Sequence, residues 1–235
     1  MEREMVVRTV DGKRKRSAKP QEERRADLLD AAAAIFSRDG VADAKVEDIT
    51  EYANVSKGTF YLYFESKDVA AAAVWRRHID EFIRIGEAIL ADETIAIGAR
   101  LVRVFESLMQ FTLAHAALHR SLYGTAGADT VKSSANQRLI ALIGQAAQHG
   151  VDIGELQCDQ PDLLASTLFH GLCGSFNDAS RSKSPAKSSD ALIWTARRLA
   201  STVFGINEAA AAMVAASVPT PCVPAPTAAD AAPAI

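Results

Sequence analysis

Apolar side chains recur three and four residues apart along almost the whole chain between residues 20 and 206. In the first such segment, Leu28, Ala32 and Ile35 share this spacing. It places apolar side chains on one face of an α-helix. No alternating run of β-branched residues bounded by turn residues, the signal of a strand, interrupts the pattern. The sequence therefore predicts an all-α protein.

Proline, serine and glycine mark where the predicted helices begin and end. Pro20 suits a first helical turn, where its missing N–H costs nothing, and Gly40 supplies a stop. Ser66 is the expected N-cap of a long helix that runs to about Leu90. The other helices are expected at 46–53, 57–64, 94–115, 117–124, 130–149, 161–180 and 189–206.

The composition is that of a folded protein. The 235 residues are 49% apolar and 23% charged, which is enough apolar surface for a core and excludes collagen-like, fibrous and fully disordered chains. No membrane span is expected, and the first residues, Met-Glu-Arg-Glu, do not resemble a secretory signal. Cys158, Cys173 and Cys222 are odd in number and far apart, so we expect no disulfide framework and a reducing cytoplasm.

The two ends of the chain differ in character from its middle. The net charge is −3, yet five of the seven residues from Lys13 to Lys19 are basic. Residues 1–19 are thus expected to form a flexible basic arm, which either contacts a polyanion or is only a solvated tail. Residues 208–235 are rich in alanine and proline, and we expect them to be mostly disordered, although 208–217 is also compatible with an extension of the last helix.

Residues 46–64, VEDITEYANVSKGTFYLYF, have the pattern of two short helices joined by a tight turn. Asn54 tolerates the left-handed conformation that such a turn requires, and Ser56 can cap the second helix. Gly58 lets a backbone or a phosphate approach closely. Phe60 and Phe64 are four residues apart and are expected to face the core together.

The remaining side chains of the second short helix are left on its other faces. They are Lys57, Thr59, Tyr61, Leu62 and Tyr63. An ammonium and several hydroxyl groups on one short helix suit contacts with phosphates and base edges in a major groove of DNA.

The run ITEYANVSKGTFYLYFESKDVAAAAV, with LLDAAAAIFSRDGVADAKVEDI before it, resembles the TetR/AcrR family of transcriptional regulators over residues 21–75. The resemblance implies a three-helix DNA-binding domain at 20–66 and a larger helical domain at 67–207. It also implies a homodimeric repressor of palindromic double-stranded operator DNA, released by a small effector. Contacts with phosphates are implied for Tyr61, Tyr63 and Lys67, and contacts near the bases for Lys57, Thr59 and Leu62. The full set of expected DNA-binding residues is Lys45, Ser56, Lys57, Gly58, Thr59, Tyr61, Leu62, Tyr63 and Lys67.

Two positions depart from the family pattern. Asn54 stands where glycine is usual, a mild change because asparagine also adopts the left-handed conformation. Ala44 and Lys45 stand where a threonine or serine usually caps the first short helix. The cap is therefore lost, at about 1 kcal/mol, or shifted to Asp43, and Lys45 would replace the hydroxyl as a phosphate contact.

An apolar helix followed by a few polar groups is the usual make-up of a small-molecule site. The expected pocket residues are Leu101, Phe105, Leu108, Met109, Thr112, His115, His119, Tyr123 and His170. This lining predicts a mainly hydrophobic effector, with one polar or acidic end that a histidine or Tyr123 would meet. The alternative is a solid core with histidines on the surface.

Small residues in the segment 170–175 suggest a surface on which another helix packs closely. Together with the next predicted helix they form the expected dimer interface, whose residues are Gly171, Gly174, Leu192, Trp194 and Leu199.

Other chemistries are poorly supported by the sequence. His115 and His119 share a helix face, but neither a carboxylate nor a cysteine pair accompanies them, so we expect two polar residues at a helix end and no metal. Cys173 has no companion base, and no phosphate-binding glycine loop is present, so we expect no cofactor and no enzyme. The rival hypotheses are an architectural DNA-binding protein without an effector and a helical enzyme.

Overall fold

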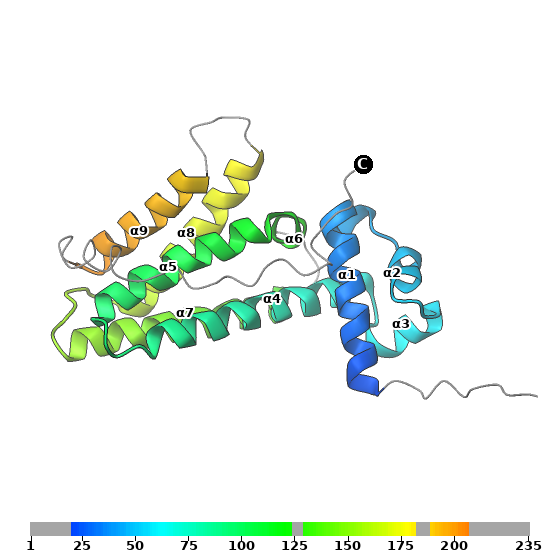
Figure 1. Cartoon of the computed structure of the whole chain (residues 1–235), viewed down its shortest axis with the longest axis horizontal. Coiled ribbons are helices and arrows are strands. Elements are labelled where there is room, and N and C mark those ends of the chain that lie inside the picture. Colours follow the sequence, from blue (N-terminus) through cyan, green and yellow to red (C-terminus); the bar gives the residue numbers. More distant parts are fainter. Residues whose placement is uncertain (1–19, 124–128, 182–188, 207–235) are drawn as a thin grey trace, which may run out of the picture.

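The computed structural model describes residues 20–123, 129–181 and 189–206 (Figure 1). Within these residues the chain forms nine α-helices and no strand, which confirms the predicted all-α class. The predicted basic arm (1–19) and C-terminal tail (208–235) lie outside the described residues. The helices are α1 (Gln21–Asp43), α2 (Val46–Tyr52), α3 (Lys57–Tyr63), α4 (Lys67–Leu90), α5 (Ile97–Ala114), α6 (Ala116–Leu122), α7 (Asp129–Asp152), α8 (Pro161–Arg181) and α9 (Ser189–Val203).

The first three helices form a small unit at one end of the molecule, with α2 and α3 on the outer side of α1 (Figure 1). Leu28 and Phe36 of α1, Ile49 of α2 and Phe60 of α3 have no exposed surface. These side chains fill the space between three helices that are too short or too polar to be stable alone.

Helix α1 extends beyond its predicted stop at Gly40. This glycine has φ 80° and ψ 159°, which breaks the helix, and helical structure resumes up to Asp43. Val41, just after the break, is buried. The glycine thus changes the direction of the chain, and burial of Val41 holds the short continuation in place.

Helix α4 joins this unit to the rest of the molecule. Its N-cap is Ser66, as predicted, whose hydroxyl accepts a hydrogen bond from the amide N–H of Val69 at 3.2 Å. Along its length α4 packs against α1, then against α5 and α7. Helix α6 also packs against α1, so the N-terminal unit meets the larger part of the chain through two helices (Figure 1).

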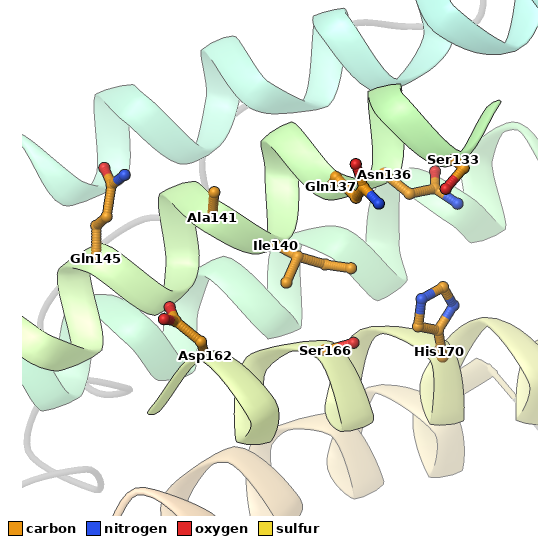
Figure 2. A pocket seen from close by; sticks show the side chains of 9 residues that line it. All are labelled: Ser133, Asn136, Gln137, Ile140, Ala141, Gln145, Asp162, Ser166 and His170. Carbon is orange, nitrogen blue, oxygen red and sulfur yellow. The ribbon is translucent and has the colours of Figure 1, made fainter. Parts of the chain in front are cut away.

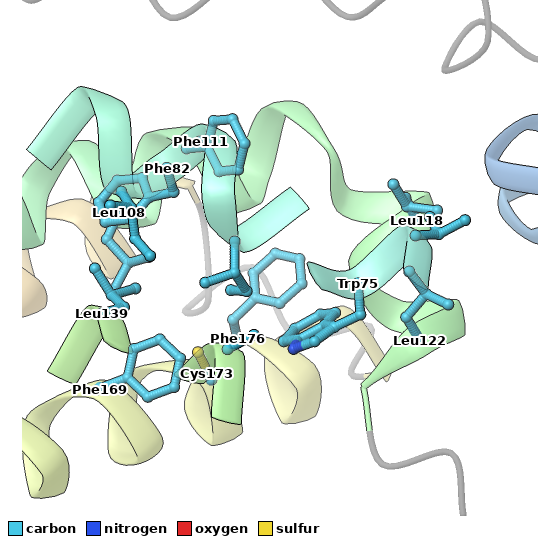
Figure 3. Close-up of a cluster of buried hydrophobic side chains, with 14 of the residues drawn as sticks. Trp75, Phe82, Leu108, Phe111, Leu118, Leu122, Leu139, Phe169, Cys173 and Phe176 are labelled. Atoms are coloured by element: carbon cyan, nitrogen blue, oxygen red, sulfur yellow. The ribbon is translucent and has the colours of Figure 1, made fainter. Parts of the chain in front are cut away.

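The larger part is a bundle in which α4, α5 and α7 lie alongside one another, α8 packs on α7, and α9 packs on α5 (Figure 1). Its core is rich in phenylalanine, and Phe82, Phe111, Phe169 and Phe176 come from three different helices (Figure 3). None of the described helices combines the length and the hydropathy that a membrane span requires.

Several predicted helix boundaries differ from the observed ones by one to three residues, and two of these differences have a clear local cause. Helix α5 begins at Ile97 rather than near residue 94, because Asp92 holds a turn by accepting from the amide N–H of Thr94 at 3.2 Å. Helix α9 ends at Val203, before Gly205, whose φ of 62° is left-handed. Both differences reflect local turns at helix ends.

Candidate DNA-binding surface and effector domain

Helices α2 and α3 and the turn between them have the geometry of a helix-turn-helix. Asn54 has φ 50°, which confirms the left-handed turn predicted there. The turn is closed by a hydrogen bond from the amide N–H of Val55 to the carbonyl of Thr50 at 2.9 Å. Ser56 caps α3, as predicted, because its hydroxyl accepts from the amide N–H of Thr59 at 3.1 Å.

Helix α3 buries one face and exposes the other. Phe60 and Phe64 are 0% and 2% exposed, as predicted, and their rings pack 5.5 Å apart. On the opposite side, Leu62 is 81% exposed and Tyr61 49% exposed. Tyr63 is half-buried and packs against the core. Of the predicted DNA-contacting residues, Ser56, Lys57, Gly58, Tyr61 and Leu62 are exposed and Thr59 is half-buried.

Lys57, at the start of α3, forms an ion pair with Glu47 of α2. The hydrogen bond from the ammonium lowers the pKa of the Glu47 carboxyl and raises the pKa of Lys57. Both side chains are more than half exposed, so the pair is open to exchange with solvent ions or a phosphate. Sequence spacing does not reveal this pair, because residues ten apart meet only once the turn has formed.

Lys67 is engaged within the fold. Its ammonium donates to the carbonyl oxygens of Ala42 at 2.8 Å and Ala44 at 2.9 Å. It therefore ties the first turn of α4 to the end of α1. The link to α1 is not visible in the sequence pattern, and the phosphate contact of Lys67 stays a prediction.

Helix α2 begins without a side-chain cap. Its N-cap residue is Lys45, which forms no capping hydrogen bond, so of the two alternatives the cap is lost rather than shifted to Asp43. The Lys45 side chain is exposed beside the helix-turn-helix, where a phosphate contact remains a prediction.

The family model of bacterial regulatory proteins of the tetR family matches residues 28–74, the part of the chain that holds the helix-turn-helix. The N-terminal part of this chain is a TetR-family helix-turn-helix region. One relative is the HTH-type transcriptional activator FasR of Mycolicibacterium smegmatis, which is 37% identical over 82 residues, 35% of this chain and 37% of FasR. The chain therefore spans well under half the length of FasR.

Solved structures with the same fold extend the likeness to the larger domain. A TetR-family transcriptional regulator from Mesorhizobium loti superposes with a TM-score of 0.64 and 22% identity, covering 79% of this chain and 96% of that one. FadR of Bacillus subtilis in complex with stearoyl-CoA also gives a TM-score of 0.64, at 15% identity, covering 77% of this chain and 98% of FadR. At these identities the likeness concerns the fold.

The predicted pocket residues on α5 are packed in the core. Leu101 and Phe105 have no exposed surface, and Leu108, Met109 and Thr112 are at most 4% exposed. A ligand that used these residues as a wall would have to displace packed side chains. Their role in effector binding stays a prediction.

His115 and His119 lie at helix ends, as expected, because His115 is the cap residue between α5 and α6 and His119 lies in the last turn of α6. The expectation of histidines on the surface is wrong for both. They are 7% and 2% exposed and belong to a buried cluster with His78 of α4 and aromatic neighbours. The His78 and His115 rings lie 5.4 Å apart, and His119 packs 5.3 Å from Trp75. Because α6 begins directly after His115, its residues are brought inward by packing on α1 and α4, which the spacing alone does not reveal.

His78, His115 and His119 form what is here called the histidine cluster, and its environment favours the neutral imidazole of His78 and of His119. Burial lowers the pKa of His78 well below its usual value, with further lowering from His119, His115 and Arg77. Burial also lowers the pKa of His119 to about 4, with a smaller effect of Arg120. His115 Nδ1 lies 2.9 Å from the carbonyl of Phe111, whereas the buried His119 Nδ1 has no hydrogen-bond partner among the described residues.

The structure separates His170 from the histidine cluster. Tyr123 stacks on His119 at 5.4 Å, but His170 is exposed on α8. It lines a groove of about 650 Å³ between α7 and α8 (Figure 2). The groove residues are Ser133, Asn136, Gln137, Ile140, Ala141, Gln145, Asp162, Ser166 and His170.

The predicted dimer residues lie on an outer face of α8 and α9. Trp194 is 65% exposed and Leu199 42%, while Leu192 is half-buried. A Cβ added at Gly171 would meet nothing within 4 Å, and at Gly174 it would meet only the Tyr123 hydroxyl, at 3.9 Å. Within one chain, then, neither glycine is needed for close packing, which leaves both available to a second chain.

Cys173 does not suit nucleophilic chemistry. It is buried in the core, and burial raises the pKa of its thiol to about 12. A thiol with that pKa stays protonated at neutral pH, and a protonated thiol is a poor nucleophile.

Proposed function

We propose that this chain is a transcriptional repressor that binds operator DNA through α3. The carrying observation is the exposed face of α3, where Leu62 and Tyr61 project beside Lys57 while Phe60 and Phe64 anchor the opposite face. A helix that is anchored through one buried face and exposes the opposite face can enter a major groove. An apolar side chain such as Leu62 suits the methyl group of thymine, and tyrosine hydroxyls suit phosphates. We propose repression and not activation, because a repressor needs only to occupy its DNA site.

The proposed active form is a homodimer joined through the outer face of α8 and α9. This interface is supported by the exposed tryptophan of α9 and by two glycines of α8, at each of which an added Cβ would meet at most one atom within 4 Å. Two-fold symmetry would present two copies of α3 to a palindromic operator, with half-sites about 34–36 Å apart.

A small hydrophobic effector is proposed to release the operator. Helix α4 supports this mechanism, because it runs from the effector domain to the helix-turn-helix and is tied to α1 through Lys67. A ligand that favours a different tilt of α4 would change the separation of the two α3 helices and lower the DNA affinity. FadR, which shares the fold, binds stearoyl-CoA, in keeping with an apolar ligand in this architecture.

Fluorescence anisotropy with duplex DNA at several salt concentrations tests the DNA-binding proposal. Lys45→Ala should weaken binding to every sequence and reduce the slope of log K against log salt by about 0.9, the contribution of one phosphate contact. Leu62→Ala should instead change the preference among sequences. Ile153→Ala, a change at an exposed apolar residue far from α3, is the matched control and should alter neither. If Leu62→Ala keeps the wild-type affinity for every sequence, α3 is not the DNA-reading helix.

A further inference from the structure

The groove between α7 and α8 has the size of a small-molecule site, and polar side chains line it along both helices. Figure 2 shows Asp162 and Gln145 toward one end, Asn136 and His170 toward the other, and Ile140 between them. The α8 residues of the groove are spaced four apart, so they form one stripe along that helix. Packing between the two helices is supplied elsewhere, by buried apolar residues on their inner faces, so these polar stripes are not needed for it.

Gly144 fixes how closely the carboxylate of Asp162 approaches α7. A Cβ at this position would collide with the Asp162 side chain and would lie 3.2 Å from its Cα. The glycine therefore lets the first turn of α8 lie against α7 and places the carboxylate at the end of the groove.

Charge favours one class of ligand. Asp162 is the one acidic side chain among the nine described lining residues, and none of them is lysine or arginine. The other polar groups are hydroxyls, amides and an imidazole, which can donate or accept hydrogen bonds. An anion would find no cationic partner here, whereas a protonated amine would find a carboxylate.

Asn136 links the groove to α4. The indole N–H of Trp75 can only donate, so the atom of Asn136 that faces it at 3.0 Å is the carbonyl oxygen. The amide NH₂ of Asn136 is then the group left to donate to a ligand. Trp75 is buried and packs against His78 and His119, so a change at Asn136 reaches the interior of α4 and α6.

We propose that the α7–α8 groove is a second ligand site, separate from the apolar interior, for a small polyhydroxylated molecule that carries a protonated amine. The amine pairs with Asp162, and hydroxyl groups meet the amides and the imidazole further along. Asp162 and His170 are eight residues apart, about 12 Å along α8, which is close to the length of a disaccharide. Binding requires no DNA; only an effect of the ligand on DNA affinity rests on the proposed function.

Three disaccharides of similar size but different charge test the site: the deacetylated chitin disaccharide, which is cationic, neutral cellobiose and anionic lactobionate. The chain has two tryptophans, so an ¹⁵N-labelled protein gives two indole N–H signals in NMR. Trp75 reports on the groove, and the exposed Trp194 on α9 is the internal reference. At millimolar concentration the cationic sugar should shift the Trp75 signal saturably and leave that of Trp194 in place. The other two should bind at least about tenfold more weakly, the effect of losing a charge-assisted hydrogen bond.

Asp162→Asn should lower the affinity for the cationic sugar by about tenfold, because it removes the charge of the side chain and keeps its shape. Asp159→Asn, a change of the same kind at an exposed residue just before α8, is the matched control and should bind like the wild type. Circular dichroism and the melting temperature verify that both variants fold. Equal shifts by the three sugars, no Trp75 shift with the cationic one, or unchanged binding by Asp162→Asn would overturn the proposal. Anisotropy with duplex DNA and no sugar tests the proposed function separately.

Discussion

The indole N–H of Trp75 donates to the side-chain oxygen of Asn136 at 3.0 Å, across 61 positions of sequence. It connects α4, the helix that follows the helix-turn-helix, to α7 in the larger helical domain. The indole is 2% exposed and its neighbours include two imidazoles, so this is a polar contact at the edge of an aromatic interior.

Trp75→Phe should lower the free energy of unfolding by about 2 kcal/mol, because it removes the donor, leaves the half-buried Asn136 oxygen unpaired and creates a small void. Urea denaturation at fixed protein concentration measures the loss. Tyr52→Phe, which removes a polar group from an exposed aromatic residue of α2, is the control for stability and should lose much less. Equal losses in the two variants would mean that the hydrogen bond contributes nothing specific.

Lys67→Met should loosen the junction between α1 and α4. The variant keeps the aliphatic stem but loses the two hydrogen bonds to the carbonyls of Ala42 and Ala44. Hydrogen exchange should rise at the end of α1 and the start of α4, while the protection of α7 and α8 stays unchanged. Lys45→Met, at an exposed lysine nearby, should leave this pattern as in the wild type. If hydrogen exchange at the junction is unchanged in Lys67→Met, the two hydrogen bonds of Lys67 do not stabilise the contact between α1 and α4.

The histidine cluster predicts a loss of stability in acid. The pKa of His119 is about 4 in the fold against 6.5 when unfolded, and the pKa of His78 is lowered as well. The unfolded chain therefore binds more protons, so this stabilisation is complete above pH 6.5 and falls as the pH drops from 6.5 toward 4. Near pH 5 the loss from His119 alone should be about 2 kcal/mol.

Urea midpoints between pH 7.5 and 5 measure this dependence. His119→Phe keeps a ring in the aromatic environment but cannot be protonated, so its stability should depend less steeply on pH than that of the wild type. His149→Phe, at an exposed histidine near the end of α7, should keep the wild-type slope. The prediction fails if the slope is the same in all three proteins.

Gly174→Asp should convert the proposed dimer to monomers, because it places a charge in the face of α8 and α9 where two chains would meet. Light scattering at micromolar concentration measures the mass. Ala88→Asp, at an exposed position of α4, should stay dimeric. A monomeric wild type would contradict the proposed interface.

Local sequence signals were sufficient for the helix-turn-helix. The left-handed Asn54, the capping Ser56 and the buried Phe60 are each determined by neighbours within a few residues, and all three were predicted correctly. Contacts between distant residues were not predictable in this way. The link from Lys67 to Ala42 and Ala44 depends on how α4 docks on α1.

The larger helical domain shows the same limit. Periodicity located its helices to within a few residues, but it did not show that His115 and His119 turn inward to meet His78. The polar groove likewise combines two helices whose relative placement is set by packing, with Gly144 as a local contributor. The pattern of a single sequence indicates which side of a helix is buried. It does not indicate which other helix packs against that side.

The most direct test of the central claim, that α3 reads operator DNA, is selection of binding sites from a library of random duplexes by the wild type and by Leu62→Ala. The account predicts that the wild type enriches an inverted repeat whose half-sites are about 34–36 Å apart from centre to centre. Leu62→Ala should enrich a repeat with the same spacing but altered bases within each half-site. A wild type that enriches no sequence, or a variant that enriches the identical one, would contradict the account.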